Sequence, residues 1–242
     1  MNINSWKKFE KARERFRQEV EKLDRSLTDL QSAQQKLVDS RAEASYTVET
    51  PVVFNSALDS ITINDKIKLI LVADNPGRRE QAAQNRRYLV GPSGKIAQKF
   101  FKDNPLLGID FLKNAIILNK TPVHTPRTGD LRELYQIYAQ GLDESQRVMA
   151  DLLLEFHEAL ACPVWITGYS EMRKGGIFEV YTERLKELYA VNKKMYKQIF
   201  FFRHFSMNQF TIDLKRQALS GETVAQSLKR LGLTYRERIL QK

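Results

Sequence analysis

The chain is poor in cysteine and has no long apolar run, and both features exclude whole classes of protein. Its 242 residues include a single cysteine, Cys162, so one chain forms no internal disulfide, multi-cysteine zinc site or iron–sulfur cluster. No run approaches the roughly 18 apolar residues of a membrane helix, and the N-terminus is charged where a signal peptide is apolar. We therefore expect a soluble cytoplasmic protein in which Cys162 is a small buried residue.

Metal-ligand and nucleotide-loop patterns are missing too. The chain has three histidines, which are His124, His157 and His204. Their spacing along the chain is not that of metal ligands. A phosphate-binding loop needs a glycine ahead of its Gly-Lys pair and a serine or threonine after it. The segment "VGPSGK" contains a Gly-Lys pair, but Leu89, just before the segment, and Ile96, just after it, occupy those two positions. We expect no metal or other cofactor.

Positive charge is abundant. The formal net charge is +10 and the isoelectric point is near 9.6, values that suit a polyanionic partner and above all nucleic acid. Many basic proteins bind no nucleic acid, so the partner must be argued from a site.

Apolar residues in the first part of the chain recur at the spacings of four and three that are typical of a coiled-coil seam. They are Phe9, Phe16, Val20, Leu23, Leu27, Leu30 and Leu37. The pattern predicts one coiled-coil-like helix from residue 5 to about 44, in a unit of residues 1–45 ahead of a second domain at 46–242. The seam packs either on the protein's own domain or on a second copy, so a homodimer through this helix stays open.

The second domain alternates strand-like and helix-like segments. Runs rich in β-branched and apolar residues lie at 67–73, 114–119, 163–168 and 198–206. Stretches long enough for crossover helices lie at 93–101, 143–161 and 177–191, and residues 221–242 form one or two more helices. Strands without alternating polarity, separated by helices, predict a three-layer α/β/α domain with a central four-stranded parallel sheet.

Each apolar run stops at polar residues that a core strand does not need. The runs end in Asp74-Asn75-Pro76-Gly77, Asn119-Lys120-Thr121-Pro122, Thr167-Gly168-Tyr169-Ser170 and His204-Phe205-Ser206. Ligands of open parallel sheets bind beyond the carboxyl ends of the strands, so we expect a binding crevice there. The alternative is that "DNPG" is only a turn, since its residues are common in turns.

These blocks, in this order, resemble the uracil-DNA glycosylase superfamily across residues 65–215. The family's Gly-x-Asn/Asp/Ala-Pro-Gly/Tyr motif is matched at 73–77, and the Pro-Phe-Val-Gly-x-x-Gly block of its iron–sulfur branch is similar to residues 88–94. The family's strand ending in a base-reading asparagine resembles the segment with Asn119, and its His-Pro-Ser loop resembles 204–206. The likeness implies a DNA glycosylase fold and activity.

Three departures and one absence distinguish the chain from that pattern. Ala73 replaces the first glycine, Phe205 replaces the proline, and Leu89 stands where an aromatic ring commonly stacks on the base. The cluster-binding cysteines are absent, so the resemblance implies a divergent, iron–sulfur-free member with an Asn-Pro-Gly first motif.

The resemblance implies three catalytic residues. Asn75 would hold the attacking water but has no basic group to take its proton, so Asp74 would supply the base. His204 would stabilise the negative charge that forms on the departing base. Two alternatives stay open: Asp74 pairs with Arg78 or Arg79, and His204 merely caps its strand.

The base itself would be flipped out of the helix and bound by a separate group of residues. Asn119 has a donor and an acceptor that match the edge of uracil, and otherwise satisfies loop backbone. Tyr88 or Leu89 would form the floor on which the base stacks. Met207 or Phe210 would wedge into the vacated space, unless both belong to the core.

The remaining DNA contacts are expected from residues near these motifs: the polar or basic Ser93, Lys120, Arg127, Arg173, Lys174 and Ser206, and the apolar Met207. The sequence thus predicts a metal-free hydrolase that removes uracil or a related deaminated base from DNA during base excision repair. Two other hypotheses remain, a catalytically weak or inactive relative that binds nucleic acid, and an unrelated α/β enzyme that acts on a free nucleotide.

Overall fold

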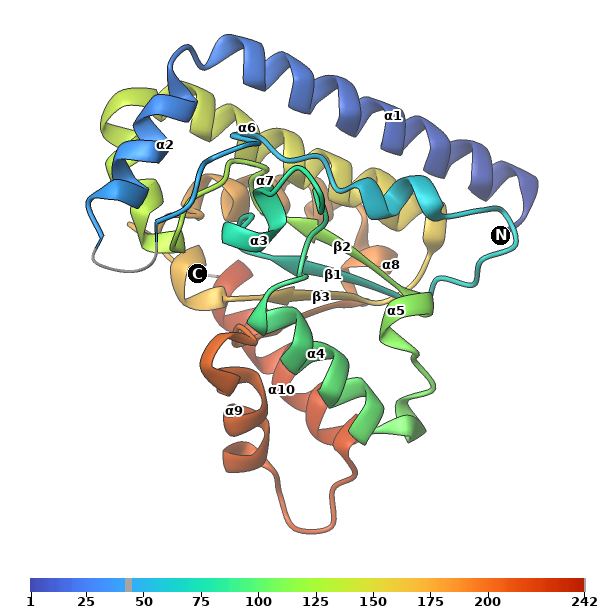
Figure 1. Ribbon diagram of the computed structural model, residues 1–242. Coiled ribbons are helices and arrows are strands. Elements are labelled where there is room, and N and C mark those ends of the chain that lie inside the picture. Colours follow the sequence, from blue (N-terminus) through green and yellow to red (C-terminus); the bar gives the residue numbers. More distant parts are fainter. Residues whose placement is uncertain (42–44, 242) are drawn as a thin grey trace.

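A four-stranded parallel sheet forms the centre of the computed structural model, which describes residues 1–41 and 45–241 (Figure 1). The strands are β1 (Leu69–Ala73), β2 (Ala115–Asn119), β3 (Val164–Thr167) and β4 (Ile199–Phe202), in the order β2-β1-β3-β4. All three neighbouring pairs are parallel. The predicted strands are therefore confirmed. β1 and β4 end before the polar residues that follow them, whereas β2 and β3 end on the polar residues Asn119 and Thr167.

Helices cover both faces of the sheet, which confirms the three-layer prediction (Figure 1). One face carries α1 (Ile3–Ser26) and α6 (Leu131–Leu160), with α7 (Glu179–Val191) packed against α6. The other face carries α4 (Pro92–Asp103), α9 (Gln209–Gln217) and α10 (Val224–Leu240). The shorter helices are α2 (Leu30–Asp39), α3 (Arg78–Gln81), α5 (Phe111–Asn114) and α8 (Lys193–Tyr196).

The strands are apolar throughout because both faces are covered. Every residue of β1 and of β3 is buried, so neither strand needs alternating polarity. On the α10 side, Gly232 lets the helix lie close to β4, since a Cβ there would stand 2.7 Å from the Phe200 Cβ.

The N-terminal seam packs on the chain itself. Phe9 and Phe16 are fully buried, and the Phe9 ring meets the Phe156 ring of α6 at 5.4 Å. The prediction of a single helix over residues 5–44 is wrong, because α1 ends at Ser26 and the backbone at Asp29 is left-handed, with φ of 60°. Residues 42–44 of that range lie outside the described residues. A homodimer through α1 stays a prediction. Since the apolar seam of α1 packs on the chain itself, such a dimer would form through the polar face of the helix.

Two further helices differ from expectation in length. α6 begins twelve residues before the predicted start at 143 and has a kink at Tyr138, where φ is −120° and ψ is 29°. Residues 221–242 contain one helix, α10, which starts at a capping box of Thr223 and Gln226. Within residues 1–41 and 45–241, no helix combines the length and apolar character that a membrane span needs.

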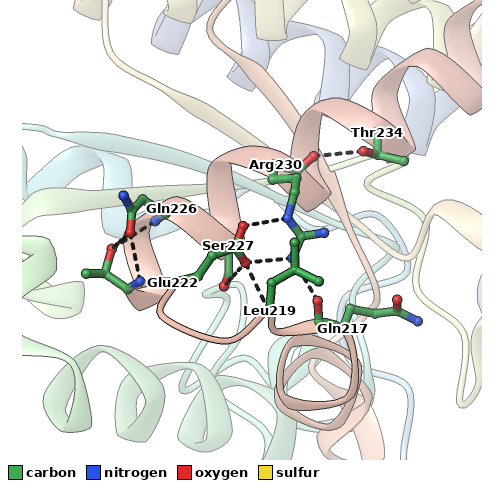
Figure 2. A network of polar contacts seen from close by, with 8 residues as sticks. Gln217, Leu219, Glu222, Gln226, Ser227, Arg230 and Thr234 are labelled. Atoms are coloured by element: carbon green, nitrogen blue, oxygen red, sulfur yellow. Dashed lines mark hydrogen bonds and ion pairs between the residues drawn. The ribbon is translucent and has the colours of Figure 1, made fainter.

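A polar network fixes the turn between α9 and α10 (Figure 2). The guanidinium of Arg230 donates to both carboxylate oxygens of Glu222, each at 2.7 Å, and Ser227 donates to the same carboxylate at 2.8 Å. These hydrogen bonds, led by the one from Arg230, lower the pKa of Glu222 to about 2. The turn is thus held by charge-assisted contacts at the end of the molecule away from α1 (Figure 1).

Candidate functional site

A cleft of two connected lobes lies at the carboxyl ends of the strands, where the sequence predicts a binding crevice. The main lobe has a volume of about 590 Å³ and the side lobe about 350 Å³. Both lobes share the walls formed by Asp74, Thr128, His204, Ser206 and Met207. Residues that follow β1 and β4 are thereby brought to one place.

Asn75 is held on the wall of the main lobe by the loop that follows β2. Its side-chain amide donates to Thr125 Oγ1 at 2.7 Å. The next residue of the loop is fixed as well, since the Pro76 carbonyl oxygen accepts from His124 Nδ1 at 2.8 Å and from the Thr125 N–H at 3.3 Å. The Asn75 side-chain oxygen accepts no hydrogen bond from the described part of the chain and is available to a ligand or water. This loop is more than a surface turn, because its conformation is set by buried partners.

Asp74 pairs with Lys120 rather than with Arg78 or Arg79. The Lys120 side chain is 0% exposed, and its ammonium donates to Asp74 Oδ1 and to the Thr167 carbonyl, each at 2.5 Å. Burial lowers the pKa of Lys120, while Asp74 acts in the opposite direction. The predicted phosphate contact of Lys120 is therefore wrong, because the ammonium lies beneath the cleft and not at its mouth.

Gly168, directly after β3, makes room for the Asp74 carboxylate. Its φ is +77°, and a Cβ at this position would stand 2.3 Å from Asp74 Oδ1. A left-handed conformation and a close approach both favour glycine here. The ends of β1, β2 and β3 thus meet around one buried ion pair.

His204 lines both lobes, so it does more than cap its strand. The Ser206 N–H donates to His204 Nδ1 at 3.0 Å, which leaves the imidazole proton on Nε2. Burial lowers the pKa of His204; Asp74 acts to raise it and Lys120 to lower it. The residue is a neutral N–H donor at neutral pH.

Leu89, and not Tyr88, forms part of the wall. Leu89 lines the main lobe with a left-handed φ of 54°, and Gly94 permits this because a Cβ there would stand 1.5 Å from the Leu89 oxygen. Tyr88 is buried, and its hydroxyl donates to the Val53 carbonyl at 2.6 Å. The stacking floor proposed for Tyr88 is therefore wrong, since the ring belongs to the core.

Asn119 does not join the other candidates on the cleft wall. Its side chain is 1% exposed and lines neither lobe, although its neighbour in the sheet, Ala73, lines the main lobe. The Asn119 Nδ2 group has no hydrogen-bond partner within residues 1–41 and 45–241. Asn75 and His204 share the cleft, whereas Asn119, the residue expected to read the base, lies behind its surface.

The predicted DNA contacts divide into two groups. Ser93, Arg127, Ser206 and Met207 line the cleft. Arg173 and Lys174 are exposed on the loop after β3 but line neither lobe.

Of the two proposed wedges, only Met207 is placed to act. Its side chain is 80% exposed at the mouth shared by both lobes, with a left-handed φ of 49°. Phe210 is 2% exposed and stacks on the Phe205 ring at 4.3 Å, so it belongs to the core.

Glu80 is a cleft residue that the sequence reasoning missed. It lines the main lobe at 8% exposure, and its carboxylate accepts from the Gly77 N–H at 2.8 Å and from the N–H groups of Leu89 and Val90. Burial raises its pKa to about 7. Half of a sequence signal was present: a glutamate three residues after the N-cap is the second member of a helix capping box, but Gly77 has no side chain to act as the first. Glu80 joins the first motif to the loop that carries Leu89.

Comparison with known proteins gives no relative on which to base a function. No protein-family model matches the chain, and a search of curated proteins finds no significant sequence match. In the described part of the chain, no group of three or more histidine, cysteine or acidic side chains is placed to hold a metal ion. The grounds for a function are therefore the cleft and its side chains.

Proposed function

We propose that the protein is a DNA glycosylase that hydrolyses the N-glycosidic bond of uracil or a related deaminated base in DNA, as a step in DNA repair. One observation carries the proposal: Asp74, Asn75 and His204, from the ends of two strands, line one cleft. Its main lobe, about 590 Å³, is within the range of small-ligand sites. The motif resemblance and the net charge of +10 support the same reading.

The water would be activated by the residues after β1. The free oxygen of the Asn75 amide accepts one hydrogen from the water and orients its lone pair toward C1′ of the deoxyribose. As the new C1′–O bond forms and the C1′–N bond breaks, the water's other proton passes to the Asp74 carboxylate. Lys120 holds Oδ1 of that carboxylate, so the second oxygen is the one that takes the proton.

The departing base would leave as an anion stabilised by His204. The electron pair of the broken bond moves onto the base, and the Nε2–H of His204 donates a hydrogen bond to the oxygen on which the charge collects. A preorganised donor of this kind is worth about 3 kcal/mol in a transition state. The base then takes up a proton from solvent.

The wall of the main lobe and its mouth would assist base flipping. Leu89 offers an apolar surface to the flipped base. Met207, exposed at the mouth, would enter the gap that the base leaves, as apolar wedges do in DNA-bending proteins. Unstacking costs a few kcal/mol, which contacts with the base and the backbone would offset.

A second candidate, nucleic-acid binding without base release, is favoured by one observation. Asn119, the residue expected to read the base, is shut off from the cleft with its amide unpaired. A protein that retains the cleft and its basic rim but lacks the base-reading group would bind DNA and leave it intact.

Base release from a defined oligonucleotide separates the two candidates. Duplex and single-stranded oligonucleotides with one uracil, hypoxanthine or xanthine are incubated with the protein and treated with alkali, which cuts at abasic sites. We expect cutting by the wild type, strongly reduced turnover in Asn75→Ala and His204→Ala, and wild-type turnover in Lys7→Ala, an exposed residue of α1 that lines neither lobe. Binding without cutting on every substrate would refute the glycosylase and support the second candidate.

A further inference from the structure

Four arginines lie close together in the segment that borders the main lobe. Arg78 and Arg79 belong to α3 and line the lobe, and Arg86 and Arg87 stand just before the buried Tyr88. All four are exposed, and none forms an ion pair with a carboxylate of residues 1–41 or 45–241. We call this set the arginine surface.

Many arginines outside this set are paired with acidic side chains. Such pairs are Arg15 with Glu155, Arg17 with Asp59, Arg41 with Asp130, Arg132 with Glu171, Arg184 with Asp151 and Arg230 with Glu222. Arg25, Arg173, Arg216, Arg236 and Arg238 form no ion pair within the described residues, but they do not make up a set of four in one short segment. On a solvated face with no binding role, we would expect acidic side chains to be mixed with the arginines and to pair with some of them. The arginine surface instead presents charge of one sign.

The one acidic residue in the segment is turned inward. Glu80 is the only aspartate or glutamate among residues 78–87, and its buried carboxylate accepts backbone N–H groups. Since burial raises its pKa to about 7, it is only partly ionised at neutral pH. The Glu49 carboxylate, which accepts from the Ala83 N–H, is the other acidic group at this segment, and it forms no ion pair with any of the four guanidinium groups. Positive charge is therefore in excess here.

The segment is held in shape before any partner arrives. Arg86 has a left-handed φ of 40°, and its carbonyl accepts from the Ser56 N–H at 2.9 Å. The Asn85 side chain donates to the Arg79 carbonyl at 2.7 Å, and the Arg78 guanidinium lies 4.9 Å from the centre of the Tyr46 ring. A fixed backbone reduces the entropy lost on binding.

We infer that the arginine surface binds the phosphates of the DNA strand that flanks the nucleotide in the cleft. Arginine matches phosphate oxygens with paired N–H donors. Arg78 and Arg79 line the main lobe, and Arg86 and Arg87 are exposed residues of the same segment that do not line it. The inference rests on the proposed function in one respect only, that the cleft receives DNA.

The salt dependence of DNA binding tests this inference. Each phosphate contact on duplex DNA contributes about 0.9 to the slope of log K against log salt concentration. Replacing Arg78, Arg79, Arg86 and Arg87 by glutamine should reduce the slope by about 3 to 4. The measurement is fluorescence anisotropy with a uracil-free duplex between about 50 and about 200 mM salt.

A charge-matched variant controls for the change in net charge. Lys7, Lys8, Lys11 and Lys66 are exposed lysines without an ion pair in the described residues. They lie at the start of α1 and just before β1, at the opposite edge of the sheet from the cleft (Figure 1). Their replacement by glutamine should leave the slope within about 1 of the wild type.

Each outcome decides a separate question. Equal slopes for the two fourfold variants would overturn the inference, even if the wild type releases uracil. A reduced slope in the arginine variant alone supports it, even if the wild type releases no base and the glycosylase proposal fails. If the fourfold arginine variant does not fold, as judged by circular dichroism, the pair Arg79→Gln and Arg87→Gln should reduce the slope by about 2, and an unchanged slope would overturn the inference.

Discussion

Replacing Glu80 by glutamine should change how the stability of the protein depends on pH. The pKa of Glu80 is raised by burial from 4.5 to about 7 in the folded protein. Between these values the folded state binds a proton that the unfolded state lacks, so this contribution to stability is present below about pH 4.5 and is lost as the pH rises through about 7. A shift of this size corresponds to about 3 kcal/mol, which the glutamine variant would lack.

His124 acts in the opposite direction over much of the same range. Burial lowers its pKa from 6.5 to about 4, so the unfolded state binds the extra proton and stability falls as the pH drops from about 6.5 to about 4. Burial also lowers the pKa of His157 and of His204, so three histidines act against Glu80. In Glu80→Gln the loss of stability on acidification should therefore be steeper than in the wild type, by about 1.4 kcal/mol per pH unit.

Urea unfolding of both proteins at a series of pH values from about 8 to about 4.5 measures this difference. We expect the wild type to gain about 3 kcal/mol relative to Glu80→Gln as the pH falls, because all other titrating groups are shared. A variant Gln84→Glu, which places a carboxyl at an exposed position nearby, should show no such change. Parallel pH profiles for wild type and Glu80→Gln would refute the assigned burial of the carboxyl group.

Three further predictions concern the cleft. Lys120→Met should lower the free energy of unfolding by about 3 kcal/mol, since it breaks a buried ion pair. Lys174→Met, at an exposed site, should change it by less than about 0.5 kcal/mol. Urea unfolding measures both values, and similar values for the two variants would contradict the pairing of Lys120 with Asp74. Gly168→Ala should reduce base release far more than Gly175→Ala. Both glycines have a left-handed backbone, but only at Gly168 would a Cβ meet the Asp74 carboxylate. Equal turnover of the two variants would refute the role of Gly168 in making room for Asp74. Base release should be constant near neutral pH and fall only in acid below the ordinary histidine range, because burial lowers the pKa of His204; a turnover that rises on acidification would contradict a neutral donor.

The sheet was predictable from the sequence because its signal is local. Each strand is a short run of apolar residues that ends at a turn, and burial on both faces removes any alternation that would obscure it. The break in the N-terminal helix was not predictable, since Leu27 and Leu30 continue the apolar spacing on either side of it. The break is visible only in the backbone of the structure, at Leu27, where φ is −94° and ψ is 74°, and at the left-handed Asp29.

The sequence predicted correctly only those cleft residues whose position is set by the strand that they follow. Asn75 and His204 follow strand ends, and the parallel topology alone brings them to one edge of the sheet. Lys120 was taken for a surface residue because lysine is normally exposed, and its burial depends on the distant partners Asp74 and Thr167. The inward placement of Asn119 likewise follows from tertiary packing and leaves no mark in the local sequence.

The buried pair beneath the cleft also constrains how this protein changes by mutation. A neutral residue in place of Asp74 would leave a buried ammonium without its counter-charge, and a side chain at Gly168 would displace the carboxylate. Single replacements at these positions are therefore harmful even where a combined replacement would be tolerated. Asp74, Lys120 and Gly168 should therefore change together or not at all, whereas the cleft residues Leu89 and Met207 are not bound by this pair and can change one at a time.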